Sequence, residues 1–365
     1  MTALPDLIKS MTDAASILLN ALDKEQCLKA RFAFENDEER HKWFYTPTQR
    51  EGLRIGEMTP NQQQNVMRLV STGLSEAGYN YACVLMGSER LVDRFQNFPD
   101  RTYGNLPNTR VRDPGNYSLG IFGSPGASSG WSWRLGGHHL NLHFTIQNGT
   151  ISVTPAFFGA EPARAIMPGG IYLRALAAEE DRARELLNSF SPEQLSQAVI
   201  APVAPTDIVQ TNRPKIEDGA LPAIGGPGPG GERLRSSLGL TPELDEMVRY
   251  SIEPKGIPAR AMTPEQTDIL VSLVNVYLDH LPEAIQAYYH WFLEPENLQT
   301  TTFSWAGPLE KGAPHYYRVQ SSGFLIEYDC TQNEANHTHS VLRNPAGDFG
   351  DDPLAAHYIS DHPNG

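Results

Sequence analysis

The sequence predicts an α+β protein made of two pseudo-repeated halves, each with helices followed by antiparallel strands, packed around a shared central site. Apolar residues recur at helical spacing near the N-terminus, strand-type alternation starts near residue 115, and both patterns return after residue 232. We expect helices and strands in 1–200, a Pro/Gly-rich linker or long loop in 201–232, and further helices and strands in 233–365, which together form one compact unit.

The first predicted elements are helices. Leu7, Met11 and Leu18 lie at helical spacing within residues 5–35, which predicts one or two amphipathic helices. Thr59-Pro60-Asn61-Gln62 begins the next helix, because Thr caps it, Pro suits its first position and Gln occupies the reciprocal capping position. A third helical segment is expected at about 86–97.

Three strands are predicted next, at Tyr117–Phe122, Trp131–Ile146 and Ile151–Phe158. The last two are joined by Gln147-Asn148-Gly149, in which Asn-Gly is a strong hairpin signal. The middle strand contains the run Gly-Gly-His-His-Leu, and alternation places His139 and His143 on one face and His138 on the apolar face. Three histidines so close together indicate that at least one of them serves a site.

The remaining predicted elements are helices and a long loop. We expect helices within 172–200, 241–250, 263–279 and 282–293, and a last helical turn at 352–358. Residues 201–232 have almost no periodicity and contain GGPGPGG near their end. This composition indicates a linker or a long active-site loop.

The two halves share a constant spacing. Met-Thr-Pro-x-Gln occurs at 58–62 and 262–266, and three strand motifs recur 184 residues apart: Gly123 with Gly307, Trp133-Arg134 with Tyr317-Arg318, and Leu142-His143-Phe144 with Ile326-Glu327-Tyr328. A constant offset predicts an internal duplication. Good capping chemistry alone would also explain the shared helix starts.

Composition excludes several classes of protein. The 365-residue chain has a formal net charge of −14, which argues against nucleic acid or an anionic membrane as the main partner. The chain shows neither an apolar run of about 18 residues nor a basic signal region, so a cytoplasmic location is expected. The 3 cysteines lack C-x-x-C spacing, which argues against a disulfide framework; Cys330 is an alternative nucleophile without an obvious base.

The candidate site is the hairpin near the C-terminal end of the sequence. Glu327 and Asp329 share one face of its first strand, and His337-Thr338-His339 places two imidazoles on one face of the second, about 7 Å apart. The returning strand can bring the histidines opposite the carboxylates. Two histidines and one carboxylate suit a divalent transition metal, although such histidines also occur as satisfied core or surface residues.

These residues predict a metal-dependent enzyme acting on a small polar or anionic molecule. The predicted metal ligands are His139, Glu327, His337 and His339, and the predicted catalytic or substrate-orienting residues are His138, His143, Arg318 and Arg343. Zinc or manganese is favoured, with iron or copper as alternatives. The favoured reaction is hydrolysis by a metal-activated water. The alternatives are a non-haem iron, manganese or copper oxygenase or isomerase, a non-catalytic metal- or ligand-binding protein, and a structural protein.

Several motifs together resemble the DUF3500 family over nearly the whole chain. They are Arg31-Phe32, Arg40, Trp43, the Gly-Gly-His-His-Leu run, Phe157–Pro162, Trp305-Ala306-Gly307, Tyr316-Tyr317-Arg318, Asn336–Val341, Arg343 and Asp348-Phe349-Gly350. The resemblance implies one family-sized unit and supplies no reaction. His138-His139 and the H-x-H match the family pattern, whereas the family more often has Asn at the position of His143.

Overall fold

The computed structural model describes residues 3–222, 235 and 239–351, and the chain forms two compact units. Unit 1 consists of Met1–Gly159, Leu278–Tyr289 and Arg343–Gly365, and unit 2 of Ala160–Tyr277 and His290–Leu342. These bounds do not coincide with the predicted ranges 1–200, 201–232 and 233–365. The predicted helical turn at 352–358 and the whole GGPGPGG run lie outside the described residues.

Unit 1 combines helices with a mostly antiparallel sheet. Its helices are α1 (Leu4–Ala21), α2 (Lys24–Ala30), α3 (Asp37–Arg40), η1 (Ile55–Glu57), α4 (Pro60–Gly73), α5 (Glu76–Phe95), η2 (Pro114–Asn116) and α11 (Glu283–His290). Its strands are β1 (Arg31–Phe32), β2 (Leu53–Arg54), β3 (Thr102–Tyr103), β4 (Leu106–Arg110), β5 (Ser118–Gly123), β6 (Trp131–Gly136), β7 (Leu140–Gln147), β8 (Thr150–Ser152) and β9 (Ala156–Ala160).

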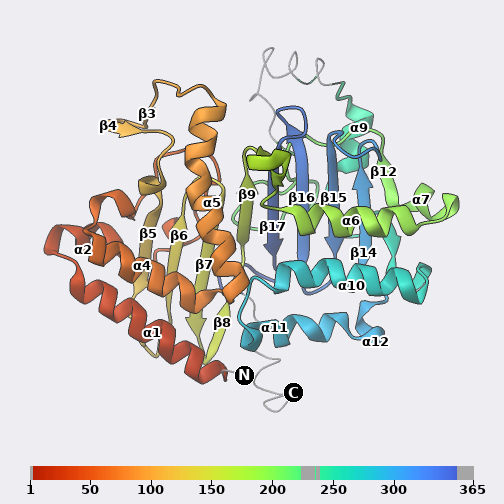
Figure 1. Cartoon of the computed structure of the whole chain (residues 1–365). Helices are drawn as coiled ribbons and strands as arrows, with labels where there is room; N and C mark the ends of the chain where they lie inside the picture. The colour runs from red at the N-terminus through yellow and green to blue at the C-terminus, as the bar shows by residue number, and fades with distance from the viewer. Residues whose placement is uncertain (1–2, 223–234, 236–238, 352–365) are drawn as a thin grey trace. The chain divides into compact units, whose positions relative to one another are not determined.

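The sheet of unit 1 has the strand order β1-β5-β6-β7-β9, with β2 beside β5 and β8 beside β7. Helices α1, α4 and α5 cover one face of it (Figure 1). The packing is close enough that a Cβ on Gly73 of α4 would lie 2.6 Å from the ring of Phe144 on β7. The apolar face of β7 predicted from alternation therefore packs on these helices.

The predicted single strand Trp131–Ile146 is wrong, because the chain turns at Gly137-His138-His139 and forms β6 and β7 instead. Gly137 N donates to Leu140 O at 2.8 Å across this turn, and His139 has a φ of 63°. A Cβ on Gly137 would lie 2.2 Å from the ring of Tyr117, so glycine is required there. The next turn, at Asn148-Gly149, is confirmed: both residues have positive φ, 53° and 75°.

Unit 2 has the same kinds of element. Its helices are η3 (Pro168–Gly170), α6 (Ala177–Ser189), α7 (Pro192–Ala198), α9 (Pro242–Val248), η4 (Ala259–Ala261), α10 (Pro264–Leu278), η5 (Trp291–Leu293) and α12 (Pro295–Leu298). Its strands are β10 (Ala165–Ile166), β11 (Tyr172–Leu173), β12 (Val199–Ala201), β13 (Ile257–Pro258), β14 (Thr302–Ala306), β15 (His315–Gln320), β16 (Leu325–Gln332) and β17 (His337–Arg343). The α+β class is thus confirmed.

The main sheet of unit 2 has the strand order β17-β16-β15-β14-β12, with β13 beside β14. Helices α6 and α10 cover one face (Figure 1), where the Tyr317 hydroxyl of β15 lies 2.6 Å from the Tyr277 hydroxyl of α10 and donates to Glu179 O of α6 at 3.1 Å. Strand alternation turns Tyr316, Arg318 and Gln320 to the opposite face. The two faces therefore differ in what covers them.

The described parts of the long connection between β12 and β13, residues 202–222, 235 and 239–256, contribute the layer on this second face. Ala204, Val209 and Tyr250 of the connection share a buried apolar cluster with Tyr316 and Leu325 of the sheet. The described part of the predicted linker or loop is thus a packed layer of unit 2. Among the described residues, no helix is both long and apolar enough to cross a membrane.

Candidate functional site

Polar side chains form a row on the face of the unit 2 sheet that the 202–256 connection covers. Arg318 on β15 lies directly opposite Glu327 on β16, and Tyr316 lies opposite Asp329. Residues two apart on a strand point to the same face, so these four side chains project together. His339 of β17 joins the row, because its Nδ1 lies 3.2 Å from Asp329 Oδ1.

Asp207 completes a compact group with Asp329 and His339. The connection that covers the sheet brings Asp207 Oδ1 to 2.9 Å from His339 Nδ1. Each of the three residues offers one ligand atom, and these atoms lie within 4.8 Å of one another. Asp329 and His339 are buried, whereas Asp207 is half-buried. The group therefore has one side in the interior of unit 2 and one towards solvent.

Neighbouring groups fix both carboxylates. Ile208 N donates to Asp207 Oδ1 at 2.7 Å, and the Thr331 hydroxyl donates to Asp329 Oδ2 at 2.9 Å. Oriented carboxylates of this kind are typical of metal sites, in which hydrogen bonds aim the ligands.

The electrostatics of this group are unusual. Burial opposes a charge on His339, but Asp207 and Asp329 together raise the pKa of His339 to about 10. Burial also raises the pKa of Asp329 above its ordinary value, although His339 acts against this shift. Without another cation, the imidazole between the two carboxylates is therefore protonated at neutral pH.

The dimensions of the group suit a small divalent cation. The two nitrogen–oxygen separations, 2.9 and 3.2 Å, are close to the edge of about 3.3 Å in a tetrahedral site with 2.0 Å bonds. Such a cation would replace the proton on His339 and remain paired with both carboxylates. Two carboxylates with one imidazole favour zinc, manganese or iron over softer ions.

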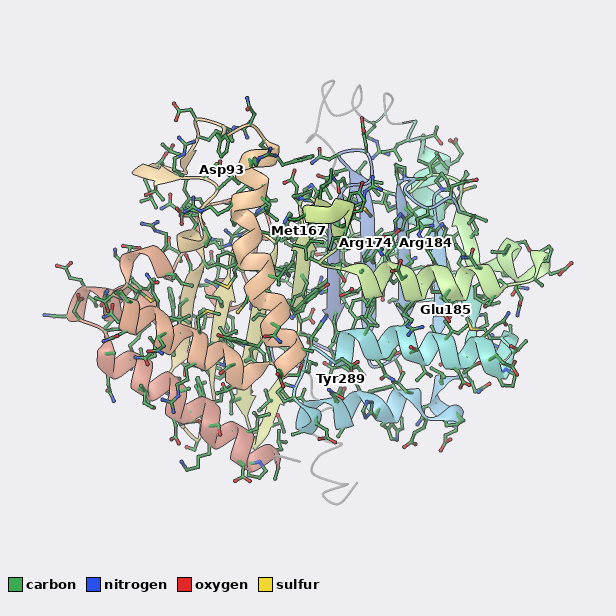
Figure 2. The ribbon with its side chains drawn as sticks, in the orientation of Figure 1. Asp93, Met167, Arg174, Arg184, Glu185 and Tyr289 are labelled. Atoms are coloured by element: carbon green, nitrogen blue, oxygen red, sulfur yellow. The ribbon has the colours of Figure 1, made fainter. Side chains whose placement is uncertain are left out.

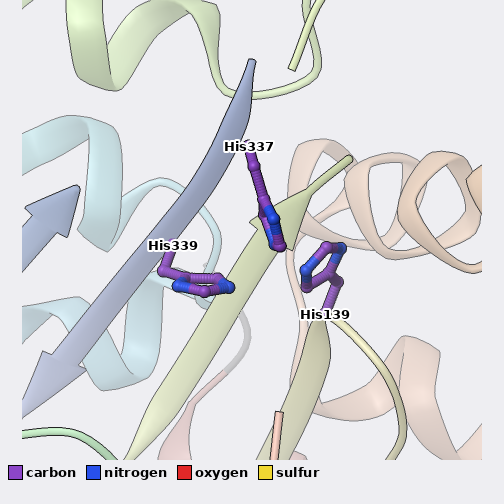
Figure 3. Close-up of side chains that lie close together, drawn as sticks. All are labelled: His139, His337 and His339. Atoms are coloured by element: carbon purple, nitrogen blue, oxygen red, sulfur yellow. The ribbon is translucent and has the colours of Figure 1, made fainter. Parts of the chain in front are cut away.

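His337 and His339 project from the same face of β17 (Figure 3), as the H-x-H spacing predicts. Their ring centroids are 4.6 Å apart with the rings edge to face. His337 is half-buried, whereas His339 is buried. His337 thus lies beside the carboxylate-bound imidazole on a more accessible side.

Glu327, a predicted metal ligand, has other partners. One carboxylate oxygen accepts hydrogen bonds from Val209 N and the Tyr316 hydroxyl, both at 2.7 Å, and the other accepts one from Gln210 N at 3.1 Å. Glu327 is not part of the group formed by Asp207, Asp329 and His339. The carboxylate beside His339 is that of Asp329, two residues further along the strand. Ligation by Glu327 stays a prediction, and its observed contacts anchor the connection to the sheet.

His138 and His139 lie in unit 1, in the turn between β6 and β7. His138 pairs with the Glu89 carboxylate, and its Nδ1 lies 3.0 Å from the Arg112 guanidinium, so its ring belongs to a buried polar cluster. The His139 ring stacks on His138 with centroids 3.7 Å apart. Metal ligation by His139 and catalysis by His138 stay predictions.

His143 and Arg343 lie in the interior of unit 1. Burial and nearby cations hold the pKa of His143 well below its ordinary value, and its ring packs edge to face on Phe349. Arg343 is fully buried and pairs with Asp348 at 2.7 Å. These contacts favour structural roles for both residues, and their predicted catalytic roles stay predictions.

Cys330 lies on the α6 face of the unit 2 sheet, at a pocket of about 220 Å³. Burial raises the pKa of its thiol to about 11, and the thiol donates to Ala335 O at 3.1 Å. Near this pocket Arg174 and Arg184, both labelled in Figure 2, pair with the Glu180 carboxylate, and Arg174 also pairs with Asp181. A protonated thiol is a poor nucleophile, so the contacts disfavour the Cys330 alternative.

Asp207 was missed by the sequence prediction. It lies in an aperiodic, proline-rich stretch, where no alternation or spacing connects it to β16 or β17. Only the packing of residues 202–222 on the sheet brings it to His339. The pairing of Asp329 with His339, in contrast, joins two neighbouring strands of one hairpin, β16 and β17.

Comparisons with known proteins give a family and no further relative. No curated protein and no solved structure matches the chain. The family described as "Protein of unknown function (DUF3500)" matches residues 5–351, which is nearly the whole chain. The chain therefore belongs to the DUF3500 family.

Proposed function

We propose that unit 2 is a metal-dependent enzyme of the hydrolase type that acts on a small polar or anionic molecule. The observation that carries this proposal is the group of Asp207, Asp329 and His339, whose ligand atoms lie within 4.8 Å of one another in a largely buried setting. Two carboxylates and an imidazole held this close in the interior are stabilised best by a cation that binds all three.

The chain's own groups have separate tasks in this proposal. Asp207 and Asp329 hold the cation and compensate its charge, while His339 gives up its proton when the cation binds. A divalent metal in such a site makes a bound water acidic enough to attack an ester or amide near neutral pH. His337, which is close to His339 and more accessible, would accept or donate the proton of that water.

A different set of ligands from the same residues and His337 supports an alternative reaction. A carboxylate together with His337 and His339 also matches the two-histidine, one-carboxylate set of non-haem iron oxygenases. Zinc would favour hydrolysis, whereas iron or copper would favour oxygen chemistry. A site that binds metal without turning over any substrate would leave a metal-binding protein.

The hydrolytic proposal is tested with metal-stripped protein. We expect zinc or manganese to restore hydrolysis of p-nitrophenyl acetate or p-nitrophenyl phosphate, and His339→Gln to abolish it. His315→Gln is the matched control, because His315 is an equally buried histidine on the opposite face of the same sheet. Metal binding without acceleration of either ester would contradict the hydrolase assignment and favour the alternatives.

We also propose that the two units arose by an internal duplication, as the sequence predicts, and a second set of observations supports this proposal. Residues 131–136 and 315–320 form β6 and β15, which are 184 residues apart, and the β2–β5 register of Leu53 with Leu119 recurs as Ile257 with Phe303 in β13–β14. In both units a parallel strand, β1 or β12, joins the first long strand. The helix-capping glutamines also pair alike, Gln26 with Gln62 and Gln194 with Gln266. These matches support a duplication.

A further inference from the structure

Arg318 carries a charge that the described residues leave without a hydrogen-bond partner. Its side chain is 1% exposed, and Nε, Nη1 and Nη2 are all buried without an acceptor in the described parts of the chain. An unpaired cation in a protein interior is strongly unfavourable. A bound anion would therefore stabilise the guanidinium in this position.

The carboxylate directly opposite Arg318 on the next strand does not pair with it. Glu327 lies directly opposite Arg318, but its oxygens accept hydrogen bonds from Val209 N, Gln210 N and the Tyr316 hydroxyl. On the other side of Arg318, Ser304 of β14 has a buried hydroxyl that also lacks a partner among the described residues. Two neighbouring donors, a guanidinium and a hydroxyl, are thus available on the same face of the sheet.

An aromatic ring and a second cation lie near Arg318. The Cζ atom of Arg318 lies over the ring of Tyr250, 5.4 Å from the ring centroid. Burial and the nearby Arg318 lower the pKa of Lys255, which is half-buried, so a second cation lies close by. The N–H groups in the plane of the guanidinium remain for a ligand, and a planar fork of this kind binds oxyanions through two parallel hydrogen bonds.

The corresponding arginine of unit 1 has all the acceptors that Arg318 lacks. Arg134 of β6 donates to Glu39 O at 2.8 Å, to Lys42 O at 2.5 Å and to the Glu39 carboxylate at 2.7 Å. These acceptors belong to the connection between β1 and β2. The equivalent connection in unit 2 places the Tyr250 ring beside Arg318 and donates a hydrogen bond from Val209 N to Glu327. Its described residues provide no hydrogen-bond acceptor for Arg318.

We propose that Arg318, with Ser304 beside it, binds a small oxyanion, either a carboxylate or a phosphate group, in the interior of unit 2. The inference goes beyond the proposed hydrolase, because it rests on the guanidinium and not on the metal ligands. The same sheet face carries Asp329 and His339.

The direct test is the thermal stability of the metal-stripped full-length protein at constant ionic strength, with chloride replaced by phosphate or acetate. A ligand at one hundred times its Kd should raise the Tm of the wild type by about 5 °C. A response to phosphate alone identifies a phosphate group, and a response to acetate alone identifies a carboxylate. No response to either anion would overturn the proposal.

Two variants test whether the rise in Tm with phosphate or acetate depends on Arg318. Arg318→Met should abolish this rise and should not lower the Tm in chloride, because the substitution removes an unpaired charge. Arg182→Met, an exposed arginine on α6 of the same unit, should keep the full response. An anion response that survives in Arg318→Met would contradict the assignment of the site.

A second measurement does not depend on a folded variant. Equilibrium dialysis of metal-stripped wild type against radiolabelled phosphate should give one bound phosphate per chain if the ligand is a phosphate group, and competition by acetate should displace it if both anions share the site. A wild type that binds neither anion would contradict the proposal and make Arg318 a structural cation.

Discussion

Arg134 in unit 1 and Arg318 in unit 2 occupy the same place on the same strand pattern, but their surroundings differ. Arg134 binds three backbone carbonyls and the Glu39 carboxylate, all from the β1–β2 connection. Arg318 packs on Tyr250 and has no acceptor among the described residues. One sheet position thus serves structure in the first unit and is left open for a ligand in the second.

Two buried histidines, one in each unit, also differ in their surroundings. His280 of unit 1 stacks on Tyr81, and burial lowers its pKa to about 4. His339 of unit 2 is also buried, yet Asp207 and Asp329 raise its pKa to about 10. His280 in unit 1 is therefore neutral, whereas His339 in unit 2 lies between negative charges of the kind that bind a cation.

The largest predicted difference between the units concerns the two arginines. Arg134→Met should lower the free energy of unfolding by about 3–5 kcal/mol, because it leaves the Glu39 carboxylate and three carbonyls without their buried partner. Arg318→Met in a chloride buffer should cause no loss. Urea unfolding of both variants measures the difference. Equal losses of stability in the two variants would show that Arg318 is as well partnered as Arg134 and would contradict the proposed difference between the two arginines.

The histidine pair gives the next prediction. The folded-state pKa of His280 lies below the unfolded value of 6.5, so its contribution to stability is complete above pH 6.5 and is lost as pH falls towards 4. A shift from 6.5 to about 4 corresponds to about 3 kcal/mol. His280→Phe should remove this share of the acid sensitivity, as seen in unfolding free energies at pH 7 and pH 4.5. An unchanged pH slope would contradict a buried neutral His280.

The charge on His339 has the opposite pH dependence. Its folded-state pKa lies above 6.5, so the stability it contributes is present below pH 6.5 and is lost as pH rises through about 10. Acid therefore should not remove the His339 contribution in the range where it removes that of His280.

A smaller effect separates the two carboxylates of β16. Asp329→Asn should weaken zinc or manganese binding by roughly 10- to 100-fold, the range found when a group that orients or completes a metal site is lost. Glu327→Gln is the matched control, since it keeps the size of a buried side chain two residues away and should leave the affinity nearly unchanged. Titration calorimetry measures both. The reverse order of effects would restore Glu327 as the ligand.

The sequence predicted the parts of this site that follow from local rules. Strand alternation and the H-x-H spacing put His337 and His339 on one face, and the hairpin brings a carboxylate to His339, although it is Asp329 and not the predicted ligand Glu327. The chain turn at His139 was not predicted, although Gly136-Gly137 interrupts the strand-forming residues of Trp131–Ile146, because the turn depends on Gly137 packing against Tyr117.

Long-range packing decided the rest. Asp207 reaches His339 only because an aperiodic connection folds back on the sheet, and no local pattern encodes that contact. The unpaired state of Arg318 was also outside the reach of the sequence, since it depends on which backbone atoms cover the guanidinium.

The most direct measurement is elemental analysis by inductively coupled plasma mass spectrometry of protein purified without an affinity tag. We predict close to one zinc, manganese or iron per chain in the wild type, retention in His315→Gln and Glu327→Gln, and loss in His339→Gln and Asp329→Asn. The same comparison with His139→Ala tests the predicted ligand of unit 1. A wild type that holds no metal after reconstitution, or a His339→Gln variant that keeps it, would contradict the metal site in unit 2.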